Sequence, residues 1–138
     1  MTKKSVSEIA TKMAAIDVAI LSTHTSGGEI AARPMSNNGE VEYDGDSYYF
    51  TWAKSRMVAD INRNSKVSLA FQGRDGFWLT IEGVGEVVRD KDEFAKHWNP
   101  DIEKWFEDGI ETEGLVMLKI GATRGYYWDG RNEGEIKF

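Results

Sequence analysis

The chain has 138 residues, which suits one domain over residues 1–138, and 41% of them are hydrophobic, so a core of its own is expected. Its net charge of −6 argues against a general nucleic-acid binder, because phosphate backbones require a broad basic surface. The chain contains no cysteine, which excludes thiol catalysis, disulfides and thiolate metal sites.

The N-terminal part of the sequence predicts a helix followed by a β-hairpin. Ser5 and Glu8 form a capping box, and the apolar residues behind them recur at helical spacing, which predicts a helix over 6–16. Residues 17–25 and 30–36 are typical of two strands, and the Ser-Gly-Gly-Glu sequence between them is typical of a tight turn.

Pro34 interrupts the second strand of this hairpin. Because proline has no N–H to donate to a β-ladder, it indicates an edge or a bulge, where a ligand can approach the backbone. Two turns are expected after the hairpin, at Asn37-Asn38-Gly39 and at Asp44-Gly45-Asp46.

The middle of the chain predicts a strand over 48–52, a helix over 54–64, a strand over 67–71 and a long strand over 77–88. Two glycines within the long strand indicate a bend such as those at barrel corners.

The last part predicts short helices over 90–98 and 100–107, followed by a strand or strand pair over 115–120 and 125–128. Many short strands with helices at their ends indicate a mainly β fold, an antiparallel barrel with flanking helices.

One short segment combines several groups that bind anions. Thr51, Lys54, Ser55 and Arg56 surround the predicted start of the second helix. A helix N-terminus presents free N–H groups and the positive end of the helix dipole, and two hydroxyls with two cations would complete a phosphate site. The alternative is a well-capped helix start with solvated charges.

The five tryptophans, five tyrosines and six phenylalanines together exceed what so small a core needs, so some of these rings are expected to face a flat ligand or a partner subunit. Trp128 is the preferred candidate for a ligand contact, and Trp105 is the second. Packing roles are expected for Trp78 and Trp98, and Trp52 is left open. The two histidines, His24 and His97, lack metal-ligand spacing, so a structural or surface role is expected for both and no metal site is predicted.

Several segments, in this order and spacing, carry a family resemblance: 32–36 (ARPMS), 48–71, 77–79 with Gly83 and Gly85, 97–100, 105–106 and 127–129. Over nearly its whole length the chain resembles the flavin-binding split-barrel proteins related to pyridoxamine 5′-phosphate oxidase, and among them the general stress protein 26-like branch.

The resemblance implies a six-stranded antiparallel split β-barrel of Greek-key type that pairs as a homodimer and holds FMN at the interface. Residues 33–36 would line the flavin ring and ribityl chain, Phe50 and Thr51 would continue that wall, and Trp128 would come from the other subunit. The implied cofactor-binding residues are Arg33, Pro34, Met35, Ser36, Phe50, Thr51, Lys54, Ser55, Arg56 and Trp128.

One position departs from the oxidase pattern. The oxidase relatives carry a lysine after the Ser-Arg pair, where this chain has Met57, and Lys54 is the candidate to replace that cation. FMN is the expected cofactor, with FAD, riboflavin and a deazaflavin as alternatives. The C-terminal motif that grips pyridoxine phosphate is not recognisable, so that oxidase activity is not expected.

The expected function is a flavin-dependent oxidoreductase acting on a small molecule. No side-chain acid, base or nucleophile stands out, which suits hydride transfer on a flavin. The alternative is a non-enzymatic flavin-binding stress-response protein that stores or senses flavin. Haem is disfavoured, because no axial histidine is expected near the phosphate site. The sequence shows neither a signal-peptide pattern nor an apolar run of about 18–20 residues, so a cytoplasmic protein without membrane contact is expected.

Overall fold

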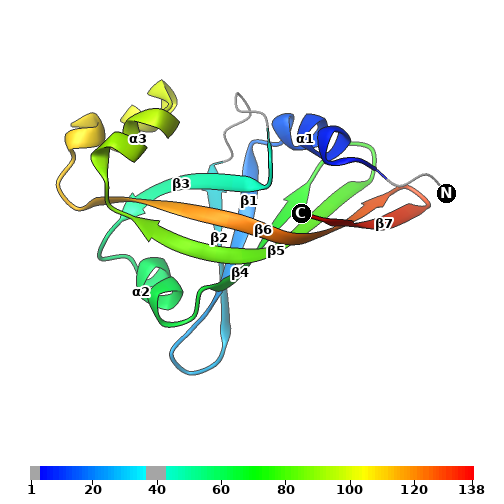
Figure 1. Ribbon diagram of the computed structural model, residues 1–138, viewed down its shortest axis with the longest axis horizontal. Helices are drawn as coiled ribbons and strands as arrows, with labels where there is room; N and C mark the ends of the chain where they lie inside the picture. The colour runs from blue at the N-terminus through cyan, green and yellow to red at the C-terminus, as the bar shows by residue number, and fades with distance from the viewer. Residues whose placement is uncertain (1–3, 37–42) are drawn as a thin grey trace.

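The computed structural model describes residues 4–36 and 43–138, which form one antiparallel sheet with helices at its ends (Figure 1). The strand order is β2-β1-β4-β5-β6-β3, and β7 pairs with β6. In chain order the strands are β1 (Val18–His24), β2 (Ile30–Ser36), β3 (Asp46–Trp52), β4 (Lys66–Gln72), β5 (Phe77–Val88), β6 (Leu115–Asp129) and β7 (Asn132–Lys137). The expected mainly β fold is confirmed, with seven strands in place of six.

The three α-helices begin within two residues of their predicted starts. They are α1 (Val6–Ala14), α2 (Arg56–Arg63) and α3 (Lys91–His97), with short 3-10 helices η1 (Pro100–Lys104) and η2 (Gly109–Glu111). The Ser5–Glu8 capping box is present. The helix predicted over 100–107 is instead the five-residue η1, because only Ile102 and Phe106 give this segment an apolar side to pack.

Two apolar clusters lie on opposite faces of the sheet, and β6 contributes to both. Val116 and Leu118 belong to the main core, which α1 and α2 close, whereas Leu115 and Met117 pack with Phe94 of α3. Figure 1 shows α3 and α2 on opposite sides of the ends of β5 and β6. The alternation of side chains along a strand therefore places the two helices on different faces.

The two strand segments predicted over 115–120 and 125–128 are one continuous strand, β6, with a bulge between them. Ile81 pairs with Gly125 and Glu82 with Arg124, but Gly83 pairs with Ala122, so Thr123 is left between the two registers. An extra residue reverses the in–out alternation, and for this reason the sequence pattern breaks although β6 is continuous.

The strand missed by the sequence analysis is β7. It carries only one buried apolar residue, Ile136, so its hydrophobic pattern is too weak to predict a strand. The Asp129-Gly130 pair is a common hairpin signal, and Gly130 has a positive φ of 63°. This dipeptide could have predicted the hairpin between β6 and β7.

The two ends of the strand order, β2 and β3, each pair on one side only. The predicted turn at Asn37-Asn38-Gly39, in the connection between them, lies outside the described residues. Among the residues that the structure describes, no helix is long and apolar enough to cross a membrane.

Candidate functional site

A groove of about 660 Å³ lies between the two edge strands, where the barrel is split. The end of β2 and the whole of β3 line it, together with the second half of α1 and residues of the segment 97–106. Five of the expected cofactor residues lie together in this lining: Pro34, Met35, Ser36, Phe50 and Thr51.

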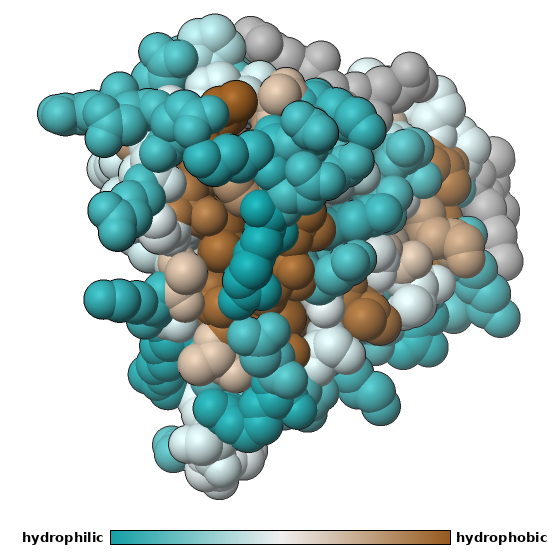
Figure 2. All heavy atoms as spheres, turned by 60° about the vertical axis from the view of Figure 1, so that its left-hand side comes forward, coloured by the Kyte–Doolittle hydropathy of each residue, from teal (hydrophilic) through white to brown (hydrophobic). Residues whose placement is uncertain are grey.

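Aromatic side chains of β3 form a wall against the segment that follows β5. The Phe50 ring packs edge-on against Trp98, with 4.9 Å between the ring centres, and Trp52 lies 4.8 Å from Phe106. Trp105 also lines the groove. On the side of the molecule that carries α2 and α3, apolar side chains form a band between hydrophilic ones (Figure 2).

His97 has a place that the sequence analysis did not predict. Its ring stacks on Tyr48 with 3.5 Å between the ring centres, and both residues line the groove. Burial lowers the pKa of His97, so its imidazole is neutral at pH 7. The available signal was its position one residue before Trp98, in a segment rich in aromatic residues.

Of the four predicted phosphate-binding residues, Thr51 lines the groove, whereas Lys54, Ser55 and Arg56 follow it in the chain and do not line the groove. Ser55 is the N-cap of α2, and its hydroxyl oxygen accepts a hydrogen bond from the Val58 N–H at 3.3 Å. Its O–H remains able to donate to an anion. Lys54 and Arg56 are exposed, and neither forms an ion pair with any residue in the described ranges 4–36 and 43–138.

Met57, at the position where the resemblance led us to expect a lysine, is a core residue. Its side chain is buried in the main core, at the first turn of α2. A lysine in that environment would bury its charge, which is unfavourable without a partner. Any phosphate bound at this helix start therefore depends on Lys54 and Arg56.

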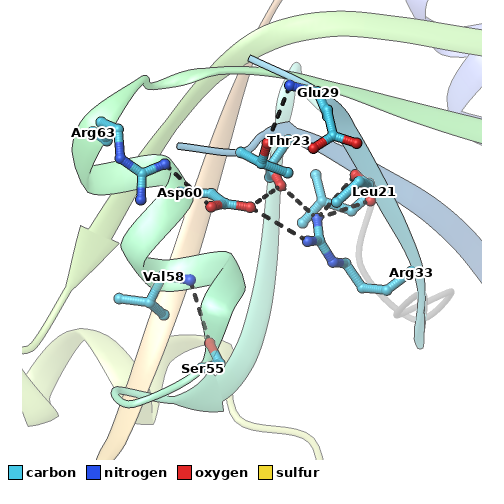
Figure 3. Close-up of polar contacts among 10 residues, drawn as sticks. Leu21, Thr23, Glu29, Arg33, Ser55, Val58, Asp60 and Arg63 are labelled. Carbon is cyan, nitrogen blue, oxygen red and sulfur yellow. Dashed lines mark hydrogen bonds and ion pairs between the residues drawn. The ribbon is translucent and has the colours of Figure 1, made fainter. Parts of the chain in front are cut away.

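Arg33 points into a buried polar network (Figure 3). Its guanidinium donates to the Thr23 hydroxyl at 2.8 Å and lies 3.7 Å from the Asp60 carboxylate. Thr23 in turn donates to Asp60 at 2.9 Å. Arg33 is not in the groove lining, but the charge of Arg56 acts on both Arg33 and Asp60, so the network lies near the start of α2.

Asp60 is the polar residue that the sequence analysis missed. It is only 2% exposed and also accepts a hydrogen bond from Arg63 at 3.3 Å. Burial alone would raise its pKa, but the hydrogen bonds from Thr23 and Arg63 and the charges of Arg56 and Arg63 outweigh this effect, and the pKa is lowered. The sequence feature that could have predicted its burial is its position three residues after Met57, which places it on the apolar face of α2.

Trp128 lies on the other side of the sheet from the main core. It pairs with Trp78 across β5 and β6, and the Tyr126 ring packs against it with 4.8 Å between the ring centres. It does not line the groove of its own chain.

The sequence matches the family described as "Pyridoxamine 5'-phosphate oxidase like" over residues 4–138, so the chain belongs to that family. A curated relative is the protein bli-3 of Neurospora crassa, which is 26% identical over 83 residues. That match covers 57% of this chain and 40% of bli-3, so the chain spans well under two thirds of this relative.

Three solved structures share the fold. The general stress protein 26 of Bacillus anthracis is 23% identical, with a TM-score of 0.78 over 94% of this chain and 95% of that one. The general stress FMN/FAD-binding protein of Xanthomonas citri is 22% identical, with a TM-score of 0.79 over 95% and 92%. A haem-binding protein of Mycobacterium smegmatis is 17% identical, with a TM-score of 0.77 over 99% and 60%. The split-barrel architecture and the likeness to general stress protein 26 are thus established.

Proposed function

We propose that the protein binds FMN in the groove between β2 and β3 and acts as a flavin-dependent oxidoreductase. The observation that carries the proposal is the position of this groove beside the start of α2, where Lys54 and Arg56 have no ion-pair partner among the described residues. The groove has the volume of a small-molecule site, and its aromatic wall suits a flat ring.

The residues of this chain would bind and orient the flavin. The Ser55 hydroxyl and the side chains of Lys54 and Arg56 would hold the phosphate, and the residues from Pro34 to Ser36 would lie along the ring with Phe50 and Thr51. Bound FMN would supply the hydride transfer. We assign no catalytic side chain, because His97 is held in a ring stack and the groove carboxylates are solvated or paired.

The absorption spectrum of the purified protein, followed by mass analysis of the released ligand, tests the cofactor. We expect flavin bands and the mass of FMN, or FMN binding when the protein is purified without ligand. A haem spectrum would support the alternative ligand. His97 would then be the candidate axial ligand, because it lines the groove. A colourless protein that binds no added FMN would contradict the proposal.

Turnover distinguishes the oxidoreductase from a protein that stores or senses flavin. With FMN, NADH or NADPH and an electron acceptor, catalysed flavin reduction should be faster than with free FMN. A rate equal to that of free FMN would favour the storage function, which needs the same site but no chemistry.

We further propose that a second copy of the chain covers the outer face of the sheet and that Trp128 of that copy closes the groove. Val18 is 50% exposed and Trp78 is 49% exposed, and both alternate with buried residues of their strands, so they share the outer face with Ile20 and Trp128. An apolar, aromatic sheet face of this kind is typical of an interface and can pair with its own copy about a twofold axis.

Ile20→Asp is expected to convert the dimer into a monomer, because it would place two carboxylates in an apolar interface. Analytical ultracentrifugation over a concentration series gives the oligomeric state, and circular dichroism checks that the monomer is folded. Ile20→Val is the control and should remain dimeric. A wild-type protein that sediments as a monomer at all concentrations would exclude the interface.

A further inference from the structure

Two tryptophan side chains of the groove lining have no role in the proposed flavin site. Trp105 is 64% exposed and Trp52 is 47% exposed, and both line the groove. The backbone of Trp105 is held in place: its N–H donates to the Ile102 carbonyl at 2.9 Å, and the next residue, Phe106, is buried in the apolar cluster around Phe94. An exposed indole in a groove lining offers a large flat surface, so Trp105 is suited to stack on an aromatic ligand.

The ring of Trp105 already holds a cation. The Lys104 ammonium lies over this ring, 5.6 Å from its centre. Among aromatic side chains, tryptophan attracts cations most strongly, because the faces of its ring are electron-rich. The lysine side chain is flexible, so a cationic ligand can displace it or stack on the other face of the indole.

The segment around Trp105 is strongly acidic. Residues 90–113, which contain α3, η1 and η2, carry nine carboxylates and three lysines, and their excess of six negative charges equals the net charge of the whole chain. Burial lowers the pKa of His97, which therefore adds no positive charge at pH 7. Asp17 and Asp101 of the groove lining form no ion pair with any residue in the described parts of the chain. This charge attracts cations to the groove and repels anions.

The chemistry of the groove points to the same class of compound. Among the described residues of the lining we assign no proton donor, since His97 is held in its ring stack with Tyr48. A planar aromatic cation needs none, because a hydride from reduced flavin forms a C–H bond on its ring and converts it into a neutral dihydro compound. The cation gains two electrons, the flavin is oxidised, and no proton has to be supplied.

We propose that the second substrate is a planar aromatic cation, whose ring stacks on Trp105 and whose charge is balanced by the carboxylates of residues 90–113 and of the groove lining. Its role as the oxidant of reduced flavin rests on the proposed function. Its binding to Trp105 does not.

Three acridines of similar shape test this specificity at pH 8: the 10-methylacridinium cation, uncharged acridine and the anion acridine-9-carboxylate. Equilibrium dialysis gives their dissociation constants for the purified protein, with and without saturating FMN. We expect the cation to bind about tenfold more tightly than acridine, since a cation–π contact contributes roughly a factor of 2 to 30, and the anion to bind most weakly. High salt should reduce these differences, because it screens the carboxylates.

Variants of the groove separate the contribution of the ring from that of the charge. Trp105→Ala should weaken the binding of all three acridines, and Trp105→Phe should retain part of it, because a smaller ring still stacks. Asp101→Asn should weaken the binding of the cation alone. Asp75→Asn, in the exposed turn before β5, removes the same charge away from the groove and is the matched control. Circular dichroism checks that each variant is folded, and none should change the affinity for FMN.

The role as a substrate has its own measurement. Protein loaded with reduced FMN should convert 10-methylacridinium into 10-methyl-9,10-dihydroacridine faster than free reduced FMN does, and mass analysis identifies this product. A rate equal to that of free reduced FMN would overturn the role of the cation as a substrate.

Three results would overturn the binding of the cation. Equal affinities for the three acridines would show that charge does not select the ligand, and unchanged affinities in Trp105→Ala would show that the indole does not bind it. Loss of cation binding in FMN-saturated protein would assign Trp105 to the flavin instead. A protein that binds no FMN but still prefers the cation would contradict the proposed function and support the contact with Trp105.

Discussion

The double variant Ser55→Ala with Arg56→Ala is expected to bind FMN about a hundredfold more weakly or worse, and riboflavin almost as well as the wild type. Two charge-assisted hydrogen bonds to a phosphate contribute roughly 1.5–3 kcal/mol each, and about 1.4 kcal/mol is a factor of ten. Riboflavin has no phosphate, so it makes neither contact. Fluorescence titration with the two flavins gives both affinities.

The comparison of two ligands separates phosphate binding from folding. Ser55 also caps α2, and its loss costs about 1 kcal/mol of stability, which would affect both flavins alike. Arg74→Ala, in the exposed turn before β5, removes the same charge elsewhere and is the matched control. Equal losses for FMN and riboflavin would show that Ser55 and Arg56 hold the fold and not the phosphate.

The parts of the fold that the sequence predicted closely are those with local signals. The bounds of β2 and β5 agree with the predicted strands 30–36 and 77–88, and Ser5 caps α1 as expected. Capping side chains and alternating apolar residues act within a few positions of the chain, so a single sequence contains them in full.

The groove could be predicted only in part, because distant segments form it. The sequence analysis named the β2 and β3 residues, but α1 and the segment 97–106 reach the same place through tertiary packing. The orientation of the Arg33 side chain could not be predicted from the sequence either. It depends on Asp60, which lies 27 positions later, and no local pattern relates the two residues.

Asp60→Ala should destabilise the protein by about 3–5 kcal/mol, the usual effect of removing one partner from a buried ion pair. The change would leave the partly buried Arg33 without its carboxylate and the Thr23 hydroxyl without its acceptor. Urea unfolding at pH 7 measures the loss. Asp108→Asn is the control, because Asp108 is exposed and its side chain makes no capping hydrogen bond.

The same carboxylate should make stability depend on pH in the acid range. Because the folded-state pKa of Asp60 is lowered from 3.8, its contribution is fully present above about pH 4 and is lost as the pH falls through the folded-state value. Asp60→Asn cannot titrate, so its free energy of unfolding should fall less steeply than that of the wild type between pH 4 and pH 2. Parallel curves would show that other carboxylates govern acid unfolding and that Arg33 does not depend on the charge of Asp60. A shallower curve would show that the buried Asp60 carboxylate is charged in the folded protein and holds the Arg33 guanidinium in the network.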